Sequence, residues 1–259
     1  MTHPAEQPWR RPLKVANREP APWAYRLLAR FVHLVMSGMV RRTWAGQENL
    51  PQGGCLVVAN HISNFDVLAL GEYLIWNGRW PRFLGKAEIW KVPVVGWFAR
   101  QCRQIPVLRN TEQAKDSLVH ARAALEAGDC VAIYPEGTIT DDPEGWPMVG
   151  RSGAARLALT TGVPVIPVGQ IGADALLGGK TLKPLRLFSL RRRPISLVAG
   201  KPVDLSDLPV SAEPSREHLA EATARIMDAI VELVAGLRGI PAPADRWDMR
   251  VAARVPRVR

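Results

Sequence analysis

The sequence predicts an α/β protein, a single layered domain in which a mostly parallel central sheet is flanked by helices, with an amphipathic helix before it. Three observations predict this class. Short runs rich in valine and isoleucine alternate with longer stretches of helical apolar spacing. Several of the short runs are apolar at nearly every position, which is typical of strands covered on both faces. A chain of 259 residues, 47% hydrophobic and 22% charged, also suits one sizeable core.

Each strand is expected where a compact apolar run is bounded by turn residues. The expected strands cover residues 54–60, 82–86, 104–109, 130–135, 163–170 and 194–200. Helices are expected between them and after the last one, over residues 65–78, 92–102, 110–129, 152–162 and 214–237. The clearest of these is 110–129, which begins at a capping residue, Asn110 or Thr111, and is closed by Gly128.

The two ends of the chain differ from this middle part. Residues 1–20 are polar and proline-rich, so we expect a flexible arm and no secretory signal. Residues 21–43 predict a helix that Arg26 and Arg30 make too polar to span a membrane. This helix either lies in the interface of an anionic membrane or packs on its own domain. The remaining segments are a main domain over 44–240 and a basic tail over 241–259.

The charge of the chain indicates anionic partners. Lysine and arginine number 34 against 24 aspartates and glutamates, a formal net charge of +10. The segment 180–194 interleaves basic residues with leucines, which suits acidic lipid headgroups, phosphates or an acidic protein face, although a solvated loop has the same pattern. No nucleic-acid motif accompanies the charge, so no nucleic acid is expected as a partner. The three cysteines lack metal-ligand spacing, so no metal is expected, and Cys55 and Cys130 begin strand-like runs that predict reduced core residues.

A histidine and an aspartate lie where the strand 54–60 gives way to the helix 65–78. If the turn folds back, the carboxylate of Asp66 reaches one nitrogen of His61 and leaves the other free to take a proton. A carboxylate in this place fixes the tautomer and stabilises the imidazolium. The alternative is a capping box, in which Asp66 serves only the helix end.

A second candidate follows the strand 130–135. Proline stops that strand, and Gly137 permits a tight turn with exposed backbone N–H groups that suit an anion, whereas Glu136 suits hydroxyl groups. A simple turn is the alternative. His61, Arg109 and Glu136 all fall just past the ends of expected strands, where ligands bind in parallel sheets. The sequence therefore predicts a site at this edge of the sheet.

Three blocks together resemble the glycerolipid acyltransferase family, which contains the 1-acylglycerol-3-phosphate acyltransferases. They are His61-x4-Asp66 in "NHISNFD", then "YPEGT", then "GVPVIPV" at 162–168, and the resemblance runs from about residue 44 to 200. It implies transfer of a fatty acyl group from acyl-CoA or acyl carrier protein, as a co-substrate, to a hydroxyl of a phosphorylated glycerol or lysolipid acceptor. It also implies a peripheral enzyme of phospholipid synthesis at the cytoplasmic face of the cell membrane, with the anionic membrane surface as a partner and no cofactor.

The same resemblance assigns roles to individual residues. His61 matches the general base that deprotonates the acceptor hydroxyl, and Asp66 matches the residue that orients it. No acyl-enzyme is then required, which fits the absence of a serine nucleophile motif. We expect backbone N–H groups in the turn after His61 to form the oxyanion site. The substrate-binding positions implied for the acceptor are Lys86, Arg109, Glu136, Gly137, Thr138 and Arg151.

One departure from the family pattern concerns the acceptor. The turn usually continues with an arginine that holds phosphate, but this chain has Ile139 there. The acceptor is therefore either a glycerol-phosphate precursor held by the other basic residues, or a different molecule such as a glycolipid or a lysophospholipid. A non-catalytic membrane-binding protein of the same fold is the alternative of another class, and the intact His61, Asp66 and Glu136 argue against it.

Overall fold

The computed structural model of the chain describes residues 7–107, 114–178 and 192–256. The strands are β1 (Val40–Ala45), β2 (Cys55–Ala59), β3 (Pro81–Lys86), β4 (Ile105–Val107), β5 (Cys130–Ile133), β6 (Val165–Ile171), β7 (Arg193–Ala199), β8 (Arg246–Asp248) and β9 (Ala253–Val255). The α-helices are α1 (Leu13–Ala16), α2 (Trp23–Met39), α3 (Asp66–Trp76), α4 (Pro93–Gln101), α5 (Ala114–Glu126), α6 (Gly153–Thr161) and α7 (Arg216–Arg238). Short 3-10 turns are η1 (Pro8–Arg10), η2 (Gln47–Asn49), η3 (Ala87–Lys91) and η4 (Ala173–Ala175).

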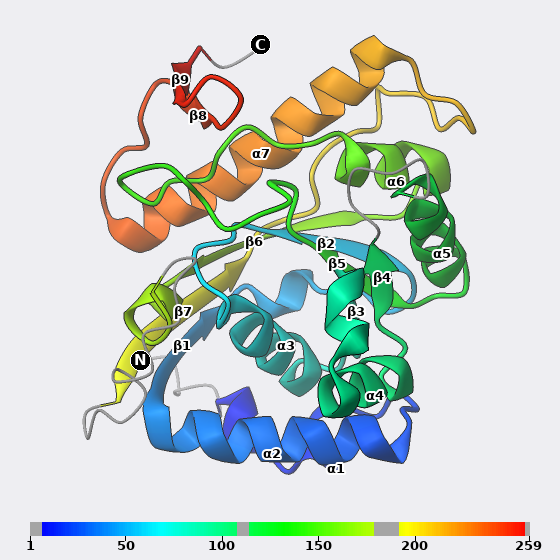
Figure 1. The fold of residues 1–259 in the computed structure, drawn as a ribbon, viewed down its shortest axis with the longest axis vertical. Coiled ribbons are helices and arrows are strands. Elements are labelled where there is room, and N and C mark those ends of the chain that lie inside the picture. Colours follow the sequence, from blue (N-terminus) through cyan, green and yellow to red (C-terminus); the bar gives the residue numbers. More distant parts are fainter. Residues whose placement is uncertain (1–6, 108–113, 179–191, 257–259) are drawn as a thin grey trace.

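Seven strands form one sheet in the order β1-β7-β6-β2-β5-β3-β4. The pairs from β6 to β4 are parallel, and β7 runs antiparallel to β6 while pairing parallel with β1. The predicted mostly parallel central sheet is therefore confirmed. Figure 1 shows α2, α3 and α4 on one side of this sheet and α5, α6 and α7 on the other.

Strand β2 shows why the sheet is a central layer. Its five residues are all buried, and alternate side chains enter different cores. Val57 packs with the aromatic cluster beneath α2 and α3, whereas Leu56 and Val58 pack with α5, α6 and α7. This is the arrangement expected for a run that is apolar at every position. Cys55 and Cys130 are free and buried, as the sequence predicts, and Cys102 is free and buried as well.

The N-terminal part differs from the expectation in two ways. From residue 7 on, the expected flexible arm folds against the domain, because Leu13 of α1 is buried in the core and the Asn17 side-chain amide donates to the carbonyl of Ile75 at 3.0 Å. The helix expected over 21–43 ends at Met39, and the chain continues as the edge strand β1 paired with β7. Arg42 lies in this strand, where its guanidinium holds the buried carboxylate of Glu72 at 2.5 and 2.8 Å.

The expected basic tail is also structured over its described part. Residues 246–255 form the hairpin of β8 and β9, which lies beside α7 (Figure 1). Gly239 in the left-handed conformation ends α7, and the chain then turns back along it. Among the described residues no helix is long and apolar enough to cross a membrane.

Candidate active site

The ends of two neighbouring strands carry the first site residues. Strands β2 and β5 are parallel neighbours, so their carboxyl ends lie side by side at one edge of the sheet. His61 follows the end of β2, and Glu136 follows the end of β5. The backbone N–H of His61 donates to the Glu136 carboxylate at 2.9 Å. The convergence predicted for these two residues is confirmed, while Arg109 lies outside the described residues.

His61 and Asp66 form the predicted pair. The His61 Nδ1 lies 2.8 Å from the Asp66 Oδ2, and Asp66 is the first residue of α3 and fully buried. The same oxygen accepts hydrogen bonds from the backbone N–H groups of Ile62 and Ser63 at 2.6 and 2.8 Å. Asp66 therefore closes the turn and fixes the histidine ring, so both interpretations of the sequence hold together. Burial raises the pKa of Asp66, against the opposing hydrogen bonds from His61 and the turn.

This arrangement determines which histidine nitrogen can react. An Nδ1–H that donates to the carboxylate leaves the lone pair on Nε2. It also engages part of the expected oxyanion site, since the N–H groups of Ile62 and Ser63 donate to Asp66. The N–H of Phe65 donates to the Ser63 hydroxyl at 3.0 Å. The first two N–H groups hold Asp66 against the histidine, and the third closes the turn on itself.

The ring of Tyr134 lies flat against the His61 imidazole. The two centroids are 4.1 Å apart and the planes differ by 11°. A tyrosine face is electron-rich, so it favours the protonated imidazole and restricts rotation of the ring. Burial raises the pKa of Tyr134 well above its usual range, so its hydroxyl stays neutral. Tyr134 was not among the site residues predicted from the sequence, although an aromatic residue directly after the strand beside His61 was a usable signal.

The Glu136 carboxylate holds the backbone and does not face the cavity. One carboxylate oxygen accepts from His61 N–H and the other from Met148 N–H, each at 2.9 Å. The side chain is 1% exposed and does not line the cavity beside His61. The role expected for it, binding an acceptor hydroxyl, is therefore not what the geometry offers. Burial raises the pKa of Glu136 to about 8, against the lowering effect of these two hydrogen bonds.

Two further contacts fix the main chain around the histidine. Thr140 N–H donates to the His61 carbonyl at 2.7 Å. Asn60, immediately before His61, exchanges hydrogen bonds with Gln170 of β6 at 2.7 and 2.9 Å. The histidine backbone is thus held from β5, β6 and the loop after the turn, which is a rigid support for a reacting side chain.

A large cavity of about 1280 Å³ opens beside His61. Four of the predicted site residues line it, namely His61, Lys86, Gly137 and Arg151. Thr138 is half-buried and does not contribute to the lining. Most of the remaining wall is apolar and comes from α2, α3, η3 and α4, including Leu28, Val32, Ile75, Trp90, Val95 and Phe98. The cavity therefore joins a small polar end to a long apolar body.

Gly137 and Arg151 are packed together at the polar end. Gly137 has φ +73°, and a Cβ on it would come within 2.9 Å of the Arg151 Nε. The glycine thus permits the turn and leaves room for a guanidinium directly over it. Ile139, at the position where an arginine was expected, is 6% exposed. Among the basic side chains that line this end, Arg151 is the one that lies over the turn.

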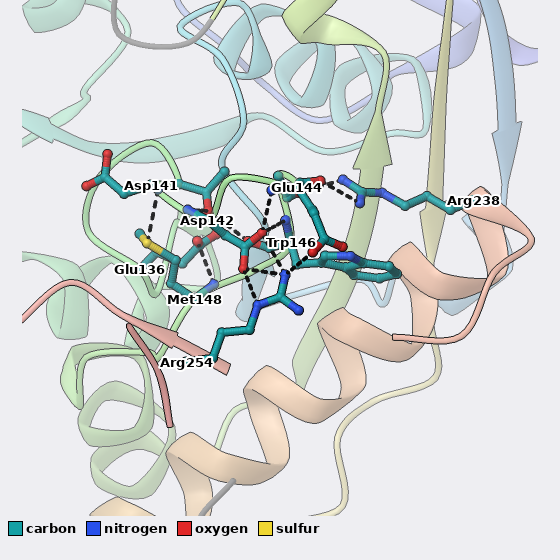
Figure 2. A network of polar contacts seen from close by, with 10 residues as sticks. Glu136, Asp141, Asp142, Glu144, Trp146, Met148, Arg238 and Arg254 are labelled. Atoms are coloured by element: carbon teal, nitrogen blue, oxygen red, sulfur yellow. Dashed lines mark hydrogen bonds and ion pairs between the residues drawn. The ribbon is translucent and has the colours of Figure 1, made fainter. Parts of the chain in front are cut away.

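The loop after the turn is clamped by the C-terminal hairpin (Figure 2). The Arg254 guanidinium binds the buried Asp142 carboxylate, with both hydrogen bonds at 3.1 Å, and lies 3.0 Å from Glu144. Arg238 of α7 lies over the Trp146 ring, 4.3 Å from its centroid. Asp142 also accepts from the Glu144 N–H at 2.8 Å. This network holds the loop that supplies the N–H groups of Thr140 and Met148, so it supports His61 from a distance.

Comparisons with known proteins identify the family of the chain. The sequence model of the family described as "Acyltransferase" matches residues 41–170. The chain is 28% identical over 180 residues to the chloroplastic 1-acyl-sn-glycerol-3-phosphate acyltransferase BAT2 of Brassica napus, covering 68% of this chain and 49% of that protein. It is 34% identical over 120 residues to the lyso-ornithine lipid O-acyltransferase of Pseudomonas aeruginosa, covering 46% of this chain and 43% of the relative.

A solved structure shares the fold. The crystal structure of the 1-acyl-sn-glycerophosphate acyltransferase PlsC from Thermotoga maritima matches with a TM-score of 0.63 and 23% identity, over 85% of this chain and 81% of that one. The chain spans about half the length of the first two curated relatives.

Proposed function

The chain belongs to the acyltransferase family, and on that premise we propose that it transfers a fatty acyl group from a thioester, acyl-CoA or acyl carrier protein, to a hydroxyl of a glycerol-phosphate lipid precursor. The observation that carries this proposal is the His61–Asp66 pair at 2.8 Å, set in the wall of a large apolar cavity. A histidine held at Nδ1 by a carboxylate presents Nε2 to a substrate as a general base.

The proposed reaction is a direct displacement. His61 Nε2 takes the proton from the acceptor hydroxyl as its oxygen attacks the thioester carbonyl. The tetrahedral intermediate then collapses, the carbon–sulfur bond breaks, and the departing thiolate receives the proton from the imidazolium. Asp66 stabilises that imidazolium, and the parallel ring of Tyr134 adds to the stabilisation. No covalent acyl-enzyme and no resident cofactor take part.

The two ends of the cavity suit the two parts of the substrates. The apolar body suits an acyl chain, because burying each CH₂ group contributes roughly 0.8 kcal/mol. Lys86 and Arg151 at the polar end suit the phosphate of the acceptor, and Arg151 is the candidate for the contact that Ile139 cannot make. Arg109 remains part of the expected acceptor set.

A second acceptor class is favoured by two observations. Ile139 is buried at the position where an arginine was expected, and a relative 34% identical over its matched part is named as a lyso-ornithine lipid acyltransferase. An acceptor with a different anionic or zwitterionic head, such as a lysophospholipid or a glycolipid, fits the same chemistry.

We place the enzyme at the cytoplasmic face of the cell membrane as a peripheral protein. Four large apolar side chains of α2 are exposed at spacings that gather them on one side of the helix, namely Trp23, Leu27, Phe31 and Leu34. Val94 and Val95 of α4 are also exposed, and both line the cavity. An apolar rim at the cavity mouth suits entry of lipid substrates from a membrane surface.

Acyl transfer by the purified protein tests the proposal. Palmitoyl-CoA and palmitoyl-acyl carrier protein are offered with glycerol 3-phosphate, 1-acylglycerol 3-phosphate, lysophosphatidylethanolamine and a glycolipid extract. His61→Ala is expected to reduce product formation by at least 10²-fold, whereas the exposed Lys201→Gln leaves it unchanged. Product from a phosphate acceptor supports the first acceptor class, and product only from another acceptor supports the second. Transfer that survives in His61→Ala contradicts the mechanism.

A further inference from the structure

A second concavity lies on the other side of α2 from the active-site cavity. It measures about 510 Å³ and runs between the N-terminal segment and α2. Its lining includes Trp9, Arg10, Lys14, Arg30, His33 and Trp76. No acidic side chain lines this cleft within the described part of the chain. We call it the α1–α2 cleft.

The walls of the α1–α2 cleft are fixed by contacts with the domain. The Trp9 ring packs edge-on against Trp44 with centroids 4.7 Å apart. The Trp76 Nε1 donates to the carbonyl of Arg11 at 3.1 Å, which ties the floor of the cleft to α3. Leu13 is buried in the core between these points. A ligand would thus meet a formed site and lose little by ordering it.

The charges of the cleft are available to an anion. Among the described residues, no carboxylate pairs with Arg10, Lys14 or Arg30, and all three side chains are exposed. The one buried acid close by is Glu72, and Arg42 already holds both of its oxygens. Within the described part of the chain, the positive charges of Arg10, Lys14 and Arg30 therefore lie together without a carboxylate partner.

His33 adds an oriented polar group. Its Nδ1 lies 2.7 Å from Glu72 Oε1, and its ring is stacked on Trp76 with centroids 4.1 Å apart. The contact with Glu72 fixes the ring and leaves Nε2 as the nitrogen for a ligand in the cleft. Arginine forks suit the several oxygens of a phosphate, and the lone pair on His33 Nε2 suits a hydroxyl of the same headgroup.

The position of the cleft on α2 identifies the source of the phosphate. Arg30 lies on the same helix as the exposed apolar side chains of Trp23, Leu27, Phe31 and Leu34, next to them at helical spacing. If those side chains enter the acyl region of a bilayer, Arg30 and the mouth of the cleft come to the level of the headgroups.

We propose that the α1–α2 cleft binds the phosphate-bearing headgroup of an anionic membrane phospholipid, at a site separate from the one where acyl transfer occurs. This inference rests on the membrane partner proposed above and makes it specific. A bound headgroup would hold α2 against the bilayer, with the mouth of the reaction cavity facing the lipid. Free phosphate compounds share the same chemistry, so the experiment has to separate the two sources.

Two double variants of equal charge test the proposal. Arg10→Gln with Arg30→Gln alters the cleft, and Lys201→Gln with Arg216→Gln removes the same charge from exposed positions elsewhere. Binding of the full-length protein is measured by flotation with vesicles of phosphatidylcholine alone and with 30% phosphatidylglycerol added. We expect the cleft variant to lose on the order of tenfold or more in affinity for the anionic vesicles. The control variant should lose less than about twofold, as expected for distant charges.

Two further measurements identify the ligand. Short-chain dihexanoyl-phosphatidylglycerol should change the fluorescence of the Trp-lined cleft in a saturable way, and the change should be absent in the cleft variant. Equal losses in the two double variants would mean diffuse surface charge and overturn the proposal. If inorganic phosphate binds as tightly as the short-chain lipid, the cleft does not select a lipid headgroup, and that part of the proposal is overturned.

The reaction itself is followed separately. Both double variants should keep the turnover of the unaltered protein with a soluble acceptor and no vesicles. This arm separates a failure of headgroup binding from a failure of the proposed function, because binding is measured without any acyl donor. A cleft variant that loses turnover with the soluble acceptor would contradict a site separate from the reaction.

Discussion

The backbone N–H of His61 donates to the carboxylate of Glu136 at 2.9 Å, which ties together residues 75 positions apart in the sequence. The second Glu136 oxygen accepts from Met148 N–H, so a single buried carboxylate joins the end of β2 to the loop after β5. His61 is therefore held by its main chain as well as by Asp66.

Glu136→Gln should lower both stability and turnover. An amide keeps one acceptor oxygen but sets an NH₂ group against a backbone N–H, and leaving that donor unpaired costs about 1–3 kcal/mol. Thermal unfolding should shift down by about 2–4 °C for each kcal/mol. In the transfer assay kcat should fall while KM for the acceptor stays the same. A large rise in KM with unchanged kcat would instead support acceptor binding by Glu136.

Because of Glu136, the free energy of unfolding should decrease as the pH rises. The pKa of Glu136 is raised by burial to about 8, above the value of about 4.3 in an unfolded chain. The folded state then holds a proton that the unfolded state releases, so this contribution is complete below pH ~4.3 and is lost as the pH rises through about 8. Urea unfolding at pH 5.5, 7 and 8.5 gives the free energy of unfolding of the unaltered protein and of Glu136→Gln. The difference in favour of the unaltered protein should become smaller as the pH rises. A constant difference would mean that Glu136 is ionised throughout.

Arg254→Met should destabilise the loop that supports the histidine. It leaves the Asp142 side chain, only 1% exposed, without its guanidinium, and we expect a loss of about 1–3 kcal/mol. Adding Asp142→Asn should restore part of the loss, which a double-mutant cycle measures. The matched control is Arg250→Met in the same hairpin, where the arginine side chain is 80% exposed and the change should cost less than about 0.5 kcal/mol.

The effect of the hairpin on catalysis has its own readout. If the network positions His61, Arg254→Met lowers kcat and leaves KM for both substrates near its original value. Full activity in a folded Arg254→Met protein would mean that the network contributes to stability but not to catalysis.

Tyr134→Leu should slow transfer more than Tyr134→Phe. Phenylalanine keeps the parallel ring over His61 and loses only the hydroxyl, whereas leucine removes the aromatic face that favours the imidazolium. A cation–π contribution of about 0.5–2 kcal/mol corresponds to a two- to thirtyfold loss of kcat for leucine. Equal rates in the two variants would remove Tyr134 from the mechanism.

Arg151→Gln should raise KM for a phosphate-bearing acceptor by about tenfold, since a charge-assisted contact is lost. The acyl donor should keep its KM, because the apolar body of the cavity is unaltered. Gly137→Ala should produce a similar acceptor defect by pushing the guanidinium aside, together with strain from φ +73°. Arg156→Gln, at an exposed position farther along the same lining, is the control. An unchanged KM in Arg151→Gln would mean that other residues bind the phosphate of the acceptor.

Much of this protein could be predicted from its sequence, because the relevant signals are local. The continuous apolar runs marked the strands β2, β5 and β6, and covered strands in alternation with helices required a layered parallel sheet. The spacing of His61 and Asp66 was enough to place both in one turn at a strand end, where the carboxylate can only reach the ring from the same side. Short-range geometry of this kind depends on a few neighbouring residues.

The remaining features depended on contacts between distant parts of the chain. The sequence around Glu136 suggested a substrate ligand, but its two partners, His61 and Met148, come from other segments and take up both oxygens. Arg254 in an expected tail pairs with Asp142, 112 positions earlier. The segment from Val40 on continued the helical pattern, yet pairing with β7 made it a strand, because the backbone hydrogen bonds of a sheet edge outweigh a weak local preference. Local sequence thus determined where the His61–Asp66 pair forms, and only the tertiary structure decided which residues hold it in place.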